Sequence, residues 1–287
     1  MPERDGHIPG VPCWVDTSQP DPEAAVGFYG DLFGWAFDDQ MPADAPGRYF
    51  VARLRSRDVA GVGSRPDEGP PTAMWNTYIW VDSADDTAAG VRDEGGTVLT
   101  APFDVYDAGR MAVCSDPSGA AFCVWQANQH KGAQVVNEPG TWNWSDLNTR
   151  DPAGAKAFYG AVFGWEADPL DLGFGESWMW RVPGYGDFLE TFDPEIRRRQ
   201  GDAGAPTGFE DAIGWMMRMT SDQFSDDVPS HWSVTFAVDD ADAVATRAAE
   251  LGGTVIVDPY DAVFARVAVL NDPHGAVFTI SKYSPPA

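Results

Sequence analysis

The sequence predicts an α+β protein that contains the same domain twice. A stretch at residues 14–35 recurs at residues 144–165, and each copy reads as a short strand, a turn and a helix. After each copy, a second strand and helix are followed by Gly-Gly and by further short strands. The chain has 287 residues, which is long enough for two ordinary domains. We therefore expect four βαβββ modules, two in each domain.

The repeated helices carry matching signals at both ends. An Asp-Pro pair stands at residues 21–22 and again at 151–152, in the order of an N-cap followed by the first helical residue. Gly34 and Gly164 stand where a helix ends in a left-handed conformation. Between these signals, apolar residues recur at helical spacing: Ala25, Phe28 and Leu32 in the first copy, and Ala155, Phe158 and Val162 in the second.

The remaining elements follow in the same order in both copies. In the first copy we expect strands at 49–54, 59–62, 76–81, 97–99, 111–114 and 121–126, a loop at 64–72 and a helix at 85–94. In the second copy the matching elements are strands at 234–238, 267–270 and 277–281 and a helix at 241–251. An Asp-Pro-x-Gly turn precedes the closing strand of each copy.

The pattern divides the chain into a tail at 1–10, a first domain at 11–127, a linker at 128–140 and a second domain at 141–287. The second domain carries a net insertion, because residue 14 matches residue 144 whereas residue 82 matches residue 239. This insertion lies at about 183–210 and contains aromatic residues and a candidate helix at 194–200. Because long inserted loops often cover binding sites, we expect it to cover one in the second domain, with a surface decoration as the alternative.

Composition excludes several classes of partner. The formal net charge is −25, whereas nucleic-acid binding needs clustered Lys and Arg. Such a charge can attract cationic ligands, or it can serve solubility alone.

The three cysteines read as reduced core residues of a cytoplasmic protein. No long apolar run predicts a membrane span, and residues 1–10 do not resemble a signal peptide. We expect a monomer or a homodimer.

At this point the chain resembles the vicinal oxygen chelate superfamily. That group includes glyoxalase I, bleomycin-resistance and fosfomycin-resistance proteins and type I extradiol dioxygenases. The resemblance rests on the βαβββ modules, the helix ending Phe-Tyr-Gly-x-x-Phe-Gly-Trp, the Val-Asp that opens each second module and the Asp-Pro-x-Gly turn. It covers residues 11–283 and is greatest to a fused two-domain branch common in actinobacteria. It implies sheets curled into cups, with a site on the concave face.

The resemblance also implies positions for metal ligands, on the first and last strands of the modules. In this chain those positions carry Trp14, Trp144, Asn76, Ser233, Cys123 and Thr279. Hard divalent metals need converging carboxylate or imidazole ligands, which these side chains do not supply. A shift of two residues would bring in Asp16, Asp146 or His231, but the closing strands would still lack a strong ligand. We therefore expect the metal site to be lost and no cofactor to be needed.

Tryptophan supplies the positive signal, since the chain has 12 of them. Because alternate residues of a strand share a face, Asp16 faces the same side as Trp14, and Asp146 the same side as Trp144. The same parity, together with the strands around the insertion, gives the predicted ligand-binding set: Trp14, Asp16, Asn76, Tyr78, Trp80, Cys123, Trp125, Trp142, Trp144, Asp146, Trp178, Trp180, Trp215, Ser233 and Thr279. A cup lined in this way suits a flat apolar ligand. The alternative is that the rings fill the cups.

Two functional hypotheses follow. The first is a metal-independent binding protein that sequesters or delivers a planar aromatic metabolite or drug, with an amine as one option. The resemblance adds antibiotic biosynthesis or self-resistance as a setting, because some superfamily members bind drugs without transforming them. The second is a cofactor-free enzyme of the lyase, isomerase or hydroxylase type, with Asp16, Asp146 or His231 as general acid–base. A metal-dependent glyoxalase or dioxygenase is the third option.

Overall fold

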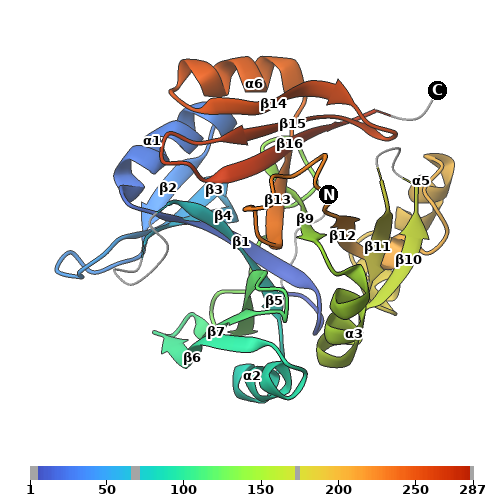
Figure 1. Ribbon diagram of the computed structural model, residues 1–287. Coiled ribbons are helices and arrows are strands. Elements are labelled where there is room, and N and C mark those ends of the chain that lie inside the picture. Colours follow the sequence, from blue (N-terminus) through green and yellow to red (C-terminus); the bar gives the residue numbers. More distant parts are fainter. Residues whose placement is uncertain (1–5, 66–71, 172–174, 285–287) are drawn as a thin grey trace.

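The computed structural model describes residues 6–65, 72–171 and 175–284, and it contains two eight-stranded mixed sheets (Figure 1). Parts of the expected tail at 1–10 and of the expected loop at 64–72 lie outside the described residues. Each sheet is built from two βαβββ modules, and the strands that open the two modules are neighbours. The predicted fold class is thus confirmed.

The first sheet has the order β2-β3-β4-β1-β5-β8-β7-β6. Its first module contains β1 (Pro12–Gln19), α1 (Pro22–Phe33), β2 (Ala36–Asp39), β3 (Tyr49–Leu54) and β4 (Arg57–Ser64). Its second module contains β5 (Met74–Trp80), α2 (Ala84–Asp93), β6 (Thr97–Val105), β7 (Gly109–Ser115) and β8 (Ala121–Ala127). Strands β1 and β5 pair antiparallel and join the two modules.

The second sheet repeats this order as β10-β11-β12-β9-β13-β16-β15-β14. Its first module contains β9 (Thr141–Thr149), α3 (Pro152–Phe163), β10 (Glu166–Leu170), β11 (Ser177–Arg181) and β12 (Ala212–Arg218). Its second contains β13 (His231–Ala237), α6 (Ala241–Glu250), β14 (Thr254–Asp261), β15 (Ala265–Asn271) and β16 (Val277–Tyr283). The insertion folds as α4 (Tyr185–Glu190), α5 (Ile196–Asp202) and the 3-10 helix η1 (Phe209–Asp211).

The signals at the helix ends act as the sequence predicts. The Asp21 carboxylate accepts a hydrogen bond from the backbone N–H of Ala24, and Gly34 ends α1 with φ 73°. Helix α3 has the same cap and the same left-handed glycine. The sequence did not predict strand β2, strand β10 or helix α4. Strand β2 is mostly exposed, so it lacks the alternation of apolar residues that reveals a strand.

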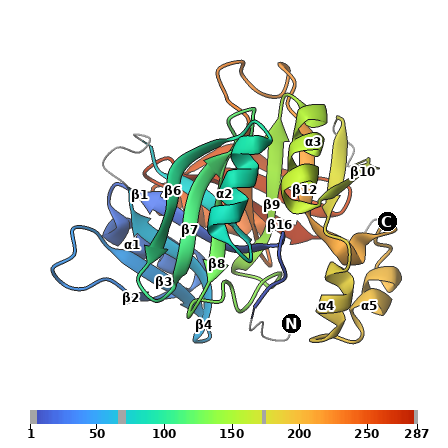
Figure 2. The same ribbon diagram turned by 90° about the horizontal axis from the view of Figure 1, so that it is seen from below.

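The two domains pack through the faces that lie opposite their cups. Helix α1 contacts α6, and α2 contacts α3, as Figures 1 and 2 show. The Tyr29 hydroxyl of α1 donates to the Asp272 carboxylate at 2.9 Å, and Tyr159 of α3 donates to Asp116 at 3.3 Å. Each repeated helix therefore reaches the Asp-Pro-x-Gly turn of the other domain, which explains these shared motifs by packing.

The linker at 128–140 runs along the concave face of the first sheet. The His130 ring lies edge-on to Trp14, with centroids 4.4 Å apart, and Ala133 N–H donates to the Cys13 carbonyl at 2.8 Å. The linker then enters the second sheet, where Gly140 N–H donates to the Ala237 carbonyl. All three cysteines are free and buried. Among the helices that the structure describes, none has the length and apolar character of a membrane span.

Candidate functional site

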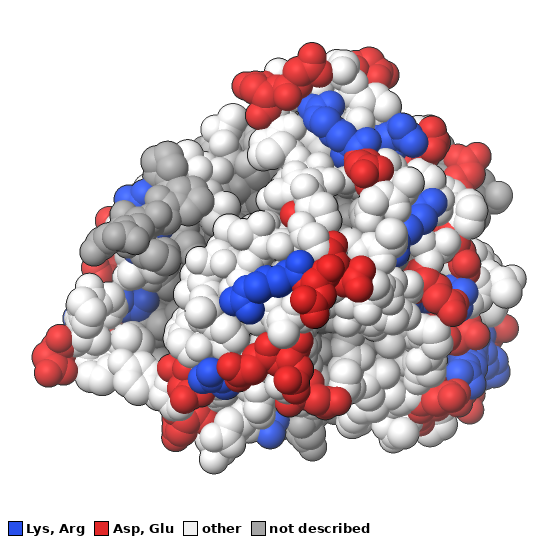
Figure 3. Space-filling view, turned by 60° about the horizontal axis from the view of Figure 1, so that its bottom comes forward, with Lys and Arg blue, Asp and Glu red and all other residues white. Residues whose placement is uncertain are grey.

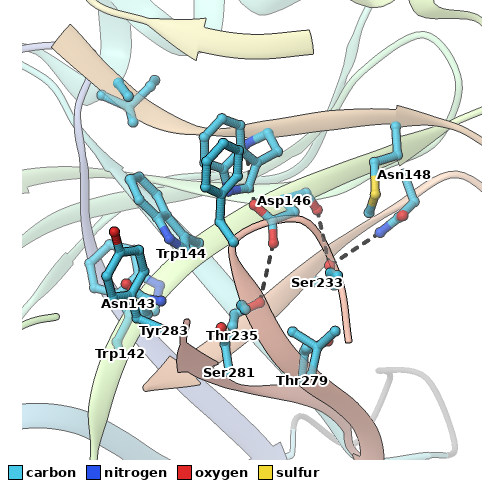
Figure 4. Close-up of a pocket in the computed structure, with 18 of the residues that line it drawn as sticks. Trp142, Asn143, Trp144, Asp146, Asn148, Ser233, Thr235, Thr279, Ser281 and Tyr283 are labelled. Carbon is cyan, nitrogen blue, oxygen red and sulfur yellow. Dashed lines mark hydrogen bonds between the residues drawn. The ribbon is translucent and has the colours of Figure 1, made fainter. Parts of the chain in front are cut away.

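The concave face of the second sheet encloses a cavity of about 1230 Å³ (Figure 4). Strands β9, β12, β13 and β16 form its floor, the insertion forms one wall and strand β14 contributes to another. Known ligand pockets typically measure about 300–1,000 Å³. The cavity is therefore large enough for a ligand with several fused rings.

Aromatic rings from three separate elements meet at one side of this cavity. Trp144 of β9 lies 5.2 Å from Trp215 of β12 and 5.9 Å from Phe209 of the insertion, measured between ring centroids. Phe209 and Trp215 are nearly parallel to each other, at 28°. All three rings line the cavity, as does Trp142. Such a cluster can stack on the face of a planar ligand.

Asp146 is the acidic residue of the cavity floor. Its side chain accepts one hydrogen bond from the Thr235 hydroxyl and one from the backbone N–H of Trp215, both at 3.2 Å. Burial raises the pKa of the Asp146 carboxyl to about 7, and these two hydrogen bonds oppose that effect. At neutral pH this carboxyl can therefore exchange a proton or accept a strong hydrogen bond.

Small polar side chains surround this carboxyl, as Figure 4 shows. The Ser233 hydroxyl donates to the backbone carbonyl of Asp146 at 3.3 Å, and the Asn148 amide donates to the Ser233 hydroxyl at 3.1 Å. Thr279 and Ser281 of β16 also line the cavity. The floor is thus made of short side chains that leave room above them.

The insertion forms a wall of the second cup. Tyr185, Leu189, Ile196 and Phe209 line the cavity, so the expected position of the insertion agrees with the structure. Of the other two aromatic residues of the insertion, Phe188 stacks on Tyr185 and Phe192 packs against Phe188.

The opposite wall remains partly open to solvent. Ile256, Val257 and Tyr260 of β14 line the cavity but are 49%, 41% and 40% exposed. Exposed apolar side chains grouped at a cavity are typical of a binding site.

The first cup is occupied by its own side chains. The Trp14 indole N–H donates to the Tyr49 hydroxyl at 2.9 Å, and the hydroxyls of Tyr49 and Tyr78 donate to Asp16 at 3.1 and 2.8 Å. The Asn76 amide also donates to Asp16, at 2.8 Å. Burial raises the pKa of Asp16, whereas these donors lower it. Trp14 and Asp16 are only 2% and 5% exposed, and the Asp16 carboxylate accepts its hydrogen bonds from side chains of its own cup.

Strand register shows which residues replace one another in the two cups. Trp14 pairs with Tyr78 just as Trp144 pairs with Thr235, so Thr235 stands where the first cup has Tyr78. On the next strand, Tyr78 pairs with Cys123 and Thr235 pairs with Thr279, so Thr279 holds the position of Cys123. Two residues further along, Ser281 of β16 therefore holds the position that Trp125 has on β8. Two large rings of the first cup are therefore small hydroxyl residues in the second.

The neighbouring strands show one further exchange in the same direction and one in the reverse direction. Tyr49 pairs with Gly63 in the first sheet, and Ser177 pairs with Met217 at the same place in the second. At Gly61 of the first sheet, an added Cβ would lie 2.4 Å from the Tyr49 hydroxyl, so glycine makes room for this ring. Trp215 occupies the position of Gly61 in the second sheet. Ser177, like Thr235 and Ser281, thus leaves room in the second cup, whereas Trp215 adds an aromatic ring to its lining.

The structure distributes the predicted site residues over three places. The open second cup contains Trp142, Trp144, Asp146, Trp215, Ser233 and Thr279. The filled first cup contains Trp14, Asp16, Asn76, Tyr78, Cys123 and Trp125. Trp80 lies beside His7, with centroids 5.8 Å apart. His231 lies on the cavity wall, and its Nδ1 is 2.9 Å from the Pro229 carbonyl oxygen.

The assignment of Trp178 and Trp180 to the ligand-binding set needs correction. Trp178 pairs with Met216, which belongs to the buried core, and the Lys156 ammonium lies 4.0 Å from its ring centroid. Trp180 is fully buried against Tyr159 of α3. Both therefore face away from the cup, because the parity of β11 depends on a pairing that sequence alone did not show.

Sequence analysis also missed three residues that shape the cups: Tyr49, Thr235 and Ser281. Aligning the strands of the two domains would have marked Thr235 and Ser281 as small residues opposite large ones. Phe209 was predicted with the other aromatic residues of the insertion to shape the mouth of the second cup, and it does line the cavity.

The donor groups of the second cup do not fit a hard divalent metal. Within the described ranges, no three His, Cys, Asp or Glu side chains lie close enough to share an ion. The groups nearest the Asp146 carboxyl are a hydroxyl and a backbone N–H that both donate to it. Metal binding needs further carboxylate or imidazole ligands at these places.

The fold and the pair of cups define a two-domain glyoxalase-like protein. A family model described as Glyoxalase/Bleomycin resistance protein/Dioxygenase superfamily matches residues 14–124, and one described as Glyoxalase-like domain matches residues 144–281. The chain belongs to this family, within the vicinal oxygen chelate superfamily.

Two relatives match nearly the whole chain. The chain is 40% identical over 289 residues to "Putative glyoxylase CFP32" of Mycobacterium tuberculosis, with 99% of each chain covered. It is 34% identical over 286 residues to "Anthracycline biosynthesis protein DnrV" of Streptomyces peucetius, with 95% of this chain and 93% of the relative covered.

Solved structures share the fold at low identity. The Mn(II)-bound glyoxalase from Novosphingobium aromaticivorans has a TM-score of 0.58 at 16% identity, with 96% of this chain and 83% of that chain covered. The 2,3-dioxygenase LapB from Pseudomonas sp. KL28 has a TM-score of 0.60 at 13% identity, with 98% and 95% covered. These similarities concern the fold alone.

Proposed function

We propose that this protein binds a planar aromatic small molecule in the cup of its second domain, without a metal ion, for sequestration or delivery. The observation that carries the proposal is the difference between the two cups. Small residues keep the second cup open where tyrosine and tryptophan fill the first. The cluster of Trp144, Trp215 and Phe209 supplies the stacking surface.

The relatives and the surface charge narrow the kind of ligand. Two relatives from Streptomyces are named anthracycline biosynthesis proteins, which favours a polycyclic metabolite or drug and a role in antibiotic biosynthesis or self-resistance. The net charge of −25 favours ligands that also carry an amine. On the face shown in Figure 3, Arg and Lys are interspersed with Asp and Glu and form no broad basic surface.

Asp146 supports a second candidate, a cofactor-free enzyme. A pKa of about 7 places this carboxyl near the pH at which a general acid–base works best. Asp16 does not suit this role, because its hydrogen bonds are satisfied inside the filled cup. His231 lies on the cavity wall and remains available to such an enzyme.

Titration with polycyclic aromatic compounds tests both candidates. Tryptophan fluorescence reports binding, and mass spectrometry of the mixture reports whether the ligand is changed. Saturable binding with intact ligand, unaffected by a chelator, supports the binding protein. Repeated turnover without metal supports the enzyme, and absence of saturable binding by any aromatic compound contradicts both.

A matched pair of variants localises the site. Trp144→Ala should weaken binding by about 2 kcal/mol, the scale of a binding hot spot, which is roughly thirtyfold. Tyr260 of β14 lines the cavity, and Phe103 holds the same position on β6 of the first domain. Tyr260→Ala should weaken binding and Phe103→Ala should not. Equal effects of these two changes would contradict the assignment to the second cup.

A further inference from the structure

The first cup contains an aromatic ring in the place that a ligand would take. The Tyr49 ring extends from β3 over β1, and its hydroxyl makes two hydrogen bonds of opposite direction. It accepts from the Trp14 indole N–H at 2.9 Å and donates to the Asp16 carboxylate at 3.1 Å. The Trp-Asp pair of β1 therefore binds a phenol that belongs to the chain itself.

The second cup keeps this pair but lacks the phenol. Trp144 and Asp146 hold the same positions on β9, and both line the cavity (Figure 4). Ser177 replaces Tyr49, and its hydroxyl donates away from the cavity to the Leu170 carbonyl. Among the described residues none accepts a hydrogen bond from the Trp144 indole N–H. The pair therefore faces the cavity with one unused donor and one carboxylate that has room for another donor.

We propose that the second cup recognises an aromatic hydroxyl of its ligand, which donates to Asp146 and accepts from Trp144 as the Tyr49 hydroxyl does between Asp16 and Trp14. This inference rests on the proposed binding function and names the chemical group of the ligand that the site recognises. A hydroxyl fits because it has both a donor and lone pairs. An ammonium group has three donors and no acceptor, so it would leave the Trp144 N–H unpaired. A methoxy group accepts but cannot donate to Asp146.

Three probes of nearly equal size separate these chemistries: 2-naphthol, 2-methoxynaphthalene and 2-(aminomethyl)naphthalene. Their affinities for the full-length protein are measured at pH 7 by tryptophan quenching and calorimetry. Because hydrogen bonds to an ionised group are the stronger ones, we expect 2-naphthol to bind about tenfold more tightly than its methyl ether, which corresponds to about 1.4 kcal/mol.

Variants of the pair connect this preference to the named atoms. Asp146→Asn should reduce the preference for naphthol over its ether to less than about threefold, since it replaces the charged acceptor of the hydroxyl proton by a neutral amide oxygen. Trp144→Phe should weaken the binding of both probes, since the hydroxyl and the ether oxygen each lose the indole N–H that donates to them. Asp258→Asn is the control, because it makes the same change from carboxylate to amide at an exposed residue of β14 outside the cavity lining, and it should leave the preference unchanged. Circular dichroism and a thermal melt of each variant confirm that it is folded.

The possible outcomes are distinct. Equal binding of naphthol and its ether by the wild-type protein would overturn this inference and leave the proposed function standing. Tighter binding of the amine, lost in Asp146→Asn, would overturn it in favour of ammonium recognition. A preference for naphthol that survives Asp146→Asn, or unchanged affinity of both naphthol and its ether in Trp144→Phe, would also overturn it. Failure of all three probes and of larger aromatic compounds would overturn the proposed function itself.

Discussion

Replacing Asp146 by Asn should stabilise the protein, by an amount that grows with pH. In the folded protein, burial raises the pKa of this carboxyl from its ordinary value of 3.8 to about 7. Between these two values the folded state binds more protons than the unfolded state, so the stability of the wild-type protein falls as pH rises. Well below pH 3.8 the carboxyl is protonated in both states and has no such effect. Well above pH 7 it is ionised in both states and the loss is complete.

The size of the effect follows from the shift. Each pKa unit corresponds to about 1.36 kcal/mol, so a shift of about three units gives a loss of about 4 kcal/mol by pH 8. Asparagine has a similar shape and does not ionise, so the variant avoids this loss. The free energy of unfolding of Asp146→Asn minus that of the wild type should therefore rise from near zero at pH 4 to about 4 kcal/mol at pH 8.

Urea unfolding of both proteins at several pH values measures this difference directly. Asp258→Asn is the control, because Asp258 is exposed on β14 and its replacement should change stability by less than about 0.5 kcal/mol at every pH. Subtracting the wild-type curve removes the contributions of the other carboxyl groups. A difference that stays flat, or that falls between pH 4 and pH 8, would refute the reasoning that Asp146 is ionised at a cost inside the cup.

Two further predictions concern the filled cup and the insertion. Trp14→Ala should destabilise the protein by about 3–5 kcal/mol, the usual cost of removing a buried Trp, and urea unfolding within 1 kcal/mol of wild type would contradict the filled first cup. Replacing residues 185–207 by a short Gly-Ser loop should weaken aromatic binding by a larger free energy than it lowers stability, because α4 and α5 line the cavity; unchanged affinity in the folded variant would show that the insertion only decorates the surface.

The fold could be predicted because its determinants are local and occur twice. The Asp-Pro caps, the glycines after the helices and the Asp-Pro-x-Gly turns are each contained within a few residues. Strand β2 could not be predicted, since its exposed position gives it no apolar alternation. The tyrosine of the repeated helix has a structural role that no local pattern reveals, because Tyr29 binds an aspartate more than two hundred residues away.

The candidate site could be predicted only in part, because its geometry depends on strand pairing. Parity along one strand correctly placed Trp144 and Asp146 on the same concave face. It gave no answer for Trp178, whose face is set by pairing with β12. Whether a cup is open depends on residues from several strands together, such as Thr235 opposite Trp144, and their register appears only in the folded chain.

The central claim is that one of two homologous cups binds a ligand and that small side chains keep it open. Calorimetric titration of the wild type and of the double variant Thr235→Tyr, Ser281→Trp with one polycyclic aromatic ligand tests this most directly. These substitutions place the large rings of the first cup into the second. We predict one ligand per wild-type chain and no measurable binding to the folded double variant. Two ligands per chain, or unchanged affinity in the double variant, would contradict the account.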